Sequence, residues 1–250
     1  MRGSQQMSRI LAGIISCSLL ALCTACACAD TLRSEFANIS PMPGGGIAIS
    51  PEGIPDGQGA FQVNIPVAYT PQGGHVFAGA YFGGVVEDDD LFKNRTGTVG
   101  TSVGGFPRVY VSGMVMSRSS AVVNAQVLAV REKPNVPCVA GGVQGFFRGD
   151  DSPRWGYVVV TKKLMWEDKS VFATVGARGN TGDWNPIGGL SIPISDSFNL
   201  AGEYDGYQLN GAVAWRPGGR CGKVTLLGGY NGHAGWLMGI GVAMPFCLSY

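Results

Sequence analysis

The sequence predicts an all-β protein: one antiparallel, up-and-down transmembrane β-barrel of about 12 to 14 strands. Apolar and polar residues alternate, with the period of a β-strand, in run after run from residue 61 onward. Many runs have about the 9–11 residues that cross a bilayer at a tilt. No segment keeps a 3.6-residue period over the length of a helix, and Gly, at 40 of 250 residues, disfavours helices.

The first 29 residues have the pattern of a secretion signal. A positive stretch with Arg2 and Arg9 precedes an apolar core over residues 10–23, which is too short to span a membrane as a helix. Small residues in Ala-x-Ala spacing follow and fit a cleavage site. The run that ends at Cys26 also resembles a bacterial lipoprotein signal, so plain cleavage and lipid attachment at Cys26 both stay open.

Residues 30–60 are rich in Pro and Gly, and we interpret them as a flexible leader before a barrel domain over residues 61–250. The first expected strand is 61–70, which alternates over its whole length. Pro66 lacks a backbone donor and would place this strand at an edge, a bulge or the barrel seam.

Further strands are expected after it, separated by turn signals such as PQGG, RGDDSP and RPGGRCG. Spacings of about 10 to 15 residues leave no room for crossover helices and favour a meander. The expected ranges are 75–86, 97–105, 108–117, 122–132, 137–147, 156–165, 171–178, 185–193, 198–204, 207–216, 223–230 and 235–246, with 45–50 as an additional candidate.

The most informative of these ranges form a hairpin over residues 198–216. A two-residue turn at Asp205-Gly206 would pair Tyr204 with Tyr207 and place the apolar faces of both strands on one side. Tyr207 and Trp215 would then bound the apolar face of the second strand. Their separation of about 26 Å, tilted by about 40°, is close to the apolar band between aromatic girdles.

The last expected strand carries the alternation to Phe246. Trp236, Met238, Ile240, Val242, Met244 and Phe246 form its apolar face. An aromatic close to the end of such a strand resembles the assembly signal of bacterial outer-membrane barrels, which implies the barrel-assembly machinery as a partner.

The segment GGLSIPISDSFNLAGEYDGYQLNGAVAWRP, with Glu203, Tyr204, Asp205 and Gly206 at its E-Y-D motif, resembles the YjbH-like outer-membrane barrels, which accompany exopolysaccharide secretion genes. The resemblance covers about 30 residues. It implies the outer membrane of a Gram-negative-type bacterium, lipid as the surroundings, and polysaccharide or small solutes as candidate partners.

Polar residues of the hairpin are the candidate site. Glu203, Gln208, Asn210 and Arg216 are expected to face the barrel lumen, where they could line a pore or pack a filled interior. The strand number does not separate these alternatives, because it lies between filled 8-stranded and open 16-stranded barrels.

We find no pattern for catalysis, metal or a cofactor. His75 and His233 lie in turn sequences, and no G-x-S-x-G motif accompanies them. The acidic run 87–90 lacks the spacing of a calcium loop, and RGD at 148–150 is best explained as chance. A net charge of +1 gives no argument for nucleic acid.

Three Cys follow the expected signal, namely Cys138, Cys221 and Cys247. They would permit one disulfide, and which two of them would pair stays open. The expected role is envelope structure or passage of solutes or polysaccharide. The alternative is a soluble secreted β-sandwich that acts as a binding or adhesion module.

Overall fold

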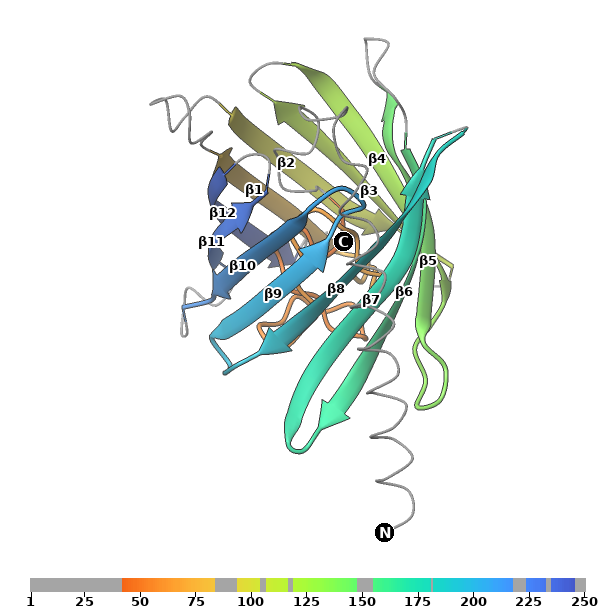
Figure 1. The fold of residues 1–250 in the computed structure, drawn as a ribbon, viewed down its shortest axis with the longest axis vertical. Helices are drawn as coiled ribbons and strands as arrows, with labels where there is room; N and C mark the ends of the chain where they lie inside the picture. Colours follow the sequence, from red (N-terminus) through yellow and green to blue (C-terminus); the bar gives the residue numbers. More distant parts are fainter. Residues whose placement is uncertain are drawn as a thin grey trace, which may run out of the picture.

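The computed structural model describes residues 42–83, 94–103, 107–116, 119–147, 155–180, 182–217, 224–232 and 235–245. Twelve strands close into a single barrel (Figure 1). Their bounds are β1 (His75–Gly83), β2 (Asn94–Val103), β3 (Arg108–Met116), β4 (Ser119–Val130), β5 (Cys138–Phe147), β6 (Trp155–Trp166), β7 (Lys169–Gly179), β8 (Trp184–Pro193), β9 (Phe198–Tyr204), β10 (Leu209–Trp215), β11 (Val224–Asn231) and β12 (Gly235–Pro245).

Every strand pairs antiparallel with its neighbours in sequence, which confirms the up-and-down barrel. The barrel closes where β1 pairs with β12, from His75 opposite Pro245 to Gly83 opposite Leu237. Closure leaves no free strand edge, so the ladder satisfies backbone groups all round. The twelve expected ranges from 75–86 to 235–246 agree with these strands to within three residues at each end. Among the described residues, none forms a helix with the length and apolar character of a membrane span.

Alternation along each strand separates an outer from an inner face. In β9, exposed Phe198 and Leu200 alternate with buried Asn199 and Ala201, and β10 repeats the pattern. Among the described side chains, the outer face of the barrel is largely apolar. Its exposed large side chains include Val99, Val111, Val127, Val158, Val175, Leu190, Leu200, Val213, Leu226, Met238 and Ile240.

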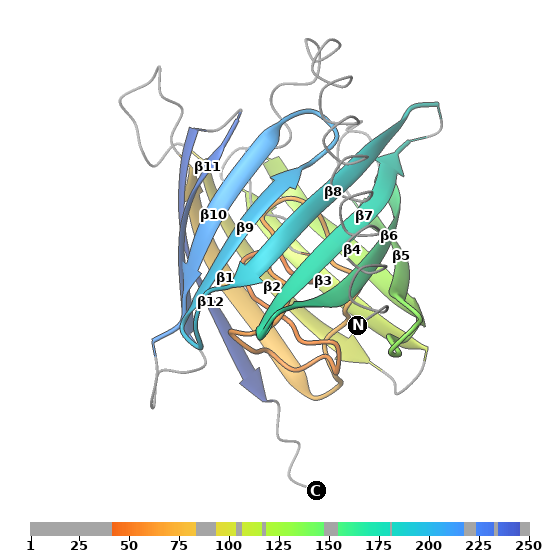
Figure 2. The same ribbon diagram turned by 60° about the horizontal axis from the view of Figure 1, so that its bottom comes forward.

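The first expected strand is wrong, because residues 61–70 form no strand. They run inside the barrel, together with residues 42–60, which were expected in the flexible leader (Figure 2). We call residues 42–72 the plug. Between Phe61 and Thr70 both alternating sets of side chains are buried, including Gln62 and Asn64. With β1 and β12 paired, this segment has no edge to join, and only isolated bridges such as Ile49 to Ala60 order it. The candidate strand at 45–50 likewise forms only isolated bridges.

The turn of the β9–β10 hairpin differs from the expected two-residue turn. Tyr204 pairs with Leu209, so four residues, Asp205 to Gln208, form the loop. The Asp205 carboxylate accepts the backbone N–H groups of Tyr207 and Gln208 and closes the loop as an Asx-type turn. The register moves by two residues, and since the side-chain period is two, the faces stay as expected.

Gly59 gives a test of the plug conformation. A Cβ on Gly59 would lie 2.6 Å from the Ile49 carbonyl oxygen, which is held in the Ile49–Ala60 bridge. We expect Gly59→Ala to lower the free energy of unfolding by about 2 kcal/mol, because backbone atoms must move. Gly202→Ala is the matched control, since nothing lies within 4 Å of a Cβ there. Urea unfolding in detergent measures both, and equal midpoints would contradict this plug path.

Candidate functional site

Glu203 is the centre of the contacts between wall and plug. Its side chain points inward from β9 and is 3% exposed. One carboxylate oxygen accepts the backbone N–H of Val63 at 2.8 Å, and the other accepts that of Asn64 at 2.6 Å. Asn210, opposite Glu203 on β10, donates its side-chain amide at 3.1 Å. The carboxylate thus clamps two successive amides of the plug with charge-assisted hydrogen bonds.

Asp205 extends this clamp from the turn. Besides closing the turn, its carboxylate accepts the side-chain amides of Asn64 at 3.3 Å and Asn210 at 2.9 Å. Arg178 of β7 donates to the Asp205 carbonyl oxygen at 2.6 Å and lies 5.9 Å from the ring centroid of Tyr207. Although it belongs to a hairpin turn, Asp205 is fully buried. The turn therefore folds inward and binds the plug at Asn64. We call Glu203, Asp205 and Asn210, with Val63 and Asn64 of the plug, the latch.

The four candidate lumen residues have different positions. Glu203 and Asn210 are buried inside the barrel. Gln208 is half-buried in the turn and donates to Asp205 and to Asn231 of β11. Arg216 follows β10 at the opposite end, where burial lowers the pKa of its guanidinium and the nearby Asp56 of the plug raises it.

Tyr207 does not bound the outer face as expected. It lies in the turn, where its ring packs edge-on against Trp155 at 6.4 Å and its hydroxyl accepts from Asn185. The four-residue turn takes Tyr207 out of β10, whose first residue is Leu209. The expected position of Tyr207 on the apolar face of this strand is therefore wrong. Its separation from Trp215 gives no evidence for the height of an apolar band.

Wall residues that sequence analysis missed hold the rest of the plug. Each uses a side chain to satisfy a backbone group of the plug, in place of a strand partner. Asn199 donates to the carbonyls of Gly57 and Gly59, Ser191 accepts from Phe61, Thr161 accepts from Ala68, Gln126 donates to Val67, and Arg108 donates to Thr70. The available signal was the inward polar residues of the strands. Their partners were not expected inside the barrel, because residues 30–60 were interpreted as a leader and residues 61–70 as a strand of the wall.

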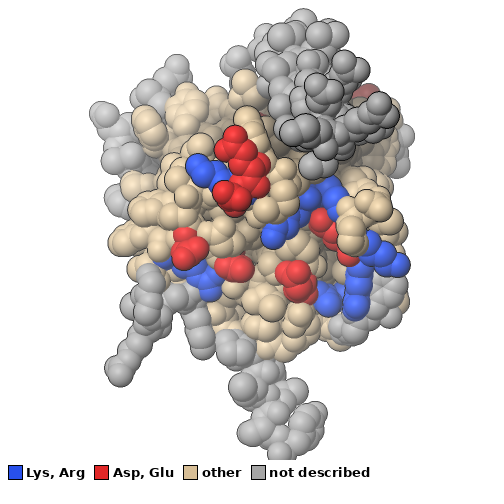
Figure 3. Space-filling view, turned by 90° about the horizontal axis from the view of Figure 1, so that it is seen from below, with Lys and Arg blue, Asp and Glu red and all other residues tan. Residues whose placement is uncertain are grey.

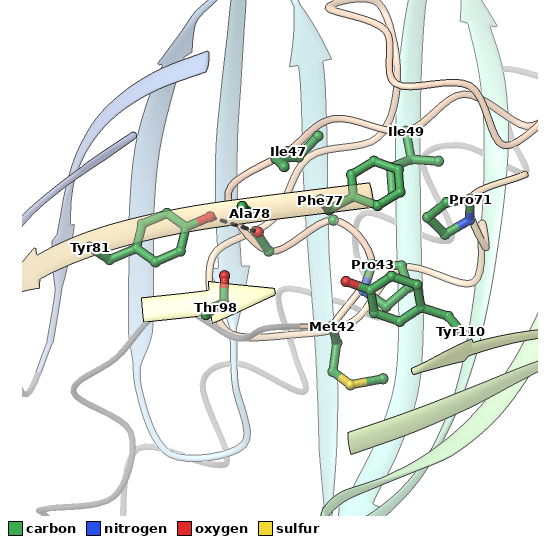
Figure 4. A pocket seen from close by; sticks show the side chains of 12 residues that line it. Met42, Pro43, Ile47, Ile49, Pro71, Phe77, Ala78, Tyr81, Thr98 and Tyr110 are labelled. Carbon is green, nitrogen blue, oxygen red and sulfur yellow. Dashed lines mark hydrogen bonds between the residues drawn. The ribbon is translucent and has the colours of Figure 1, made fainter. Parts of the chain in front are cut away.

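Apolar packing surrounds one part of the plug. Ile49, Ile65 and Val67 of the plug form one cluster with wall residues such as Val159 and Phe172. A cavity of about 20 Å³ lies beside Met42, Tyr81 and Tyr110 (Figure 4). It has room for about one water molecule. A second cavity, beside Asp56 and Arg216, measures about 10 Å³. Neither of these two cavities is a passage through the barrel.

The end of the barrel that carries the β6–β7 turn shows Lys and Arg interspersed with Asp and Glu (Figure 3). There Lys162 pairs with Glu132 at 3.1 Å, and Glu132 also accepts from the hydroxyl of Tyr69 in the plug. Burial raises the pKa of Tyr69 well above its usual range, and Glu132 raises it further. The hydroxyl therefore stays a donor, and it ties the plug to the β4–β5 turn.

Aromatic side chains stand at both ends of the apolar outer face. At the end where β8 and β12 begin, Trp184 and Trp236 are more than half exposed, and Trp236 packs edge-on against Tyr230. At the opposite end, Phe198 stacks on Trp215 with ring centroids 6.2 Å apart. Aromatic residues at both ends of an apolar band are typical of transmembrane barrels.

The described residues show no arrangement for metal chemistry, since no group of three or more His, Cys, Asp or Glu side chains could hold an ion. His75 begins β1, where its carbonyl accepts from Thr101. Cys138 is buried as a free thiol. Cys26, Cys221, Cys247, His233, Phe246 and the runs 87–90 and 148–150 lie outside the described residues.

The comparisons with known proteins give no family. No family model matches the chain, and no curated protein matches it closely enough to count as a relative.

Proposed function

We propose that this chain is an outer-membrane β-barrel protein of a Gram-negative-type envelope, with an envelope-structural role in its closed form. The observation that carries the proposal is the outer face of the closed barrel. Exposed Val, Leu, Ile and Met side chains cover this face, and aromatic residues lie at both of its ends. In water such a surface would aggregate, whereas in lipid it is the stable arrangement.

Charged residues support the same assignment. Among the side chains described on the outward faces of the strands, Lys162 and Lys169 are charged, and both belong to the β6–β7 hairpin at one rim. Long basic side chains at a rim can reach the lipid headgroups. The ionisable side chains of Glu203, Asp205 and Arg178 are buried in the interior, where Glu203 and Asp205 accept hydrogen bonds and Arg178 donates one to the Asp205 carbonyl oxygen.

The filled lumen supports a structural role over free diffusion. The plug occupies the lumen, and the two cavities described beside it hold about one water molecule or less. An open porin would instead keep an aqueous channel. Membrane lipid and the barrel-assembly machinery are the partners of this proposal. The E-Y-D resemblance adds exopolysaccharide as a candidate cargo, reached only if the plug moves.

A detergent gel tests the membrane assignment. We expect the purified protein to migrate faster unheated than heated, because a folded transmembrane barrel resists the detergent until boiled. Fractionation of the producing cells should place it with the outer membrane. A protein that stays in solution without detergent and shows one mobility would refute the proposal, and a sample unfolded in urea before loading is the control.

A further inference from the structure

Many inward side chains of the barrel wall are polar, beside apolar ones such as Tyr81, Tyr157 and Phe172. The described polar ones include Ser112, Asn124, Gln126, Thr161, Thr174, Ser191, Asn199, Glu203, Asn210 and Thr225, all buried. Wholly structural interiors are mostly apolar, because each buried polar group must find a partner. A polar wall is typical of barrels whose lumen holds water.

The plug shares no strand ladder with this wall. Its described bridges, such as Gly45 to Gln62 and Ile49 to Ala60, join parts of the plug to each other. Contacts to the wall use wall side chains, and water could replace each of these hydrogen bonds without breaking the sheet. The barrel and the plug are thus separable units, joined through the chain that leads into β1.

The plug is held in two zones of different character. One zone is the apolar cluster around Ile65 of the plug and Phe172 of the wall. The other zone is the latch, where Glu203 accepts hydrogen bonds from Val63 and Asn64, while Phe61 and Val63 also pack with wall residues such as Ala201 and Ala212. Beside the latch, Gln62 is fully buried, and neither end of its amide has a hydrogen-bond partner among the described residues. A buried amide without partners lowers the stability of this part of the plug.

We propose that the latch is a gate: release of plug residues 61–64 from Glu203 lets water enter and starts displacement of the plug, which opens a passage for small ions and polar solutes along the polar wall. This inference rests on the proposed membrane function. A buried carboxylate that loses its donors needs water, so release of the plug and hydration of the wall occur together. The passage therefore opens in discrete events.

Conductance across a planar lipid bilayer in potassium chloride tests the gate. We expect the wild-type protein to be closed with rare openings. Glu203→Gln leaves one oxygen for two plug N–H groups and sets an amide donor against one of them. Openings should become on the order of tenfold more frequent. Asp168→Asn is the control, because Asp168 lies exposed in the β6–β7 turn, away from the latch, and its opening frequency should match the wild type.

A disulfide lock gives an independent test that leaves the latch intact. A Cβ on Gly189 of β8 would lie 2.7 Å from the Gln62 side-chain oxygen, so Cys at both positions would face each other across the plug boundary. Gln62→Cys removes an amide that has no described partner. Cys138→Ser, Cys221→Ser and Cys247→Ser in the background prevent pairing with the other Cys of the barrel domain. The oxidised protein should show no openings, and reduction should restore them.

The outcomes separate the two proposals. If Glu203→Gln gives a heat-shifted barrel that opens no more often than Asp168→Asn, the gate is refuted while the barrel stands. If Glu203→Gln does not fold, the lock decides: equal openings before and after reduction, or no openings in either state, refute the gate. A protein that neither inserts into bilayers nor shows a heat shift removes the proposed membrane function itself.

Discussion

Replacing Val175 with Lys is expected to prevent most of the protein from folding into lipid vesicles. Val175 lies near the middle of β7, points outward and is 48% exposed. In a membrane barrel this side chain contacts the hydrocarbon core, where a Lys costs about 2 to 4 kcal/mol. The measurement is the folded fraction after dilution from urea into vesicles, determined from the heat-shifted band on a detergent gel.

The matched control for Val175→Lys is Asn135→Lys, which adds the same charge to an exposed turn between β4 and β5. We expect it to fold like the wild type, since surface changes usually cost within about 0.5 kcal/mol. Equal folding of both variants would show that Val175 meets water, and the assignment of the outer face to lipid would be lost.

Replacing Glu203 with Ala is expected to lower the free energy of unfolding by about 2 to 4 kcal/mol. The substitution leaves the N–H groups of Val63 and Asn64 without their acceptor in the interior, while the amide of Asn210 keeps Asp205 as an acceptor. Each buried polar group left unsatisfied costs about 1 to 3 kcal/mol, and partial relaxation reduces the sum. Urea unfolding of the folded barrel in detergent measures the loss.

Two further variants define the origin of this loss. Glu203→Gln keeps one acceptor oxygen, so we expect a smaller loss of about 1 kcal/mol. Asp168→Ala removes a carboxylate from the exposed β6–β7 turn and should leave stability unchanged. If Glu203→Ala were as stable as Asp168→Ala, the carboxylate would not hold the plug.

Local sequence was sufficient for the strands of the wall. Alternation in β9 and β10 gives the face of each residue directly, because the backbone of a strand sends successive side chains to opposite sides. The predicted turn at Asp205 was wrong, but the predicted faces were still correct, since a register change of two residues preserves both faces. Glu203 and Asn210 were found in this way as inward residues.

Local sequence was misleading for residues 61–70. Their alternation has the form of a strand, and Pro66 was the one sign against it. A segment becomes a strand only if a neighbouring edge is free to pair, and the pairing of β1 with β12 removes that edge. Gly241 illustrates how the wall accommodates the plug, since a Cβ there would lie 2.9 Å from Ile47.

The sequence by itself thus determined the all-β class, the strands of the wall and the apolar outer face, because these depend on the period-two geometry of single strands. Only the tertiary structure decided that the N-terminal segment fills the lumen and that Glu203 and Asp205 bind it at Asn64. These features depend on barrel closure and on contacts between residues about 140 positions apart in the chain, such as Val63 and Glu203. Pattern analysis cannot supply such contacts, because no local period links a wall side chain to the backbone it satisfies.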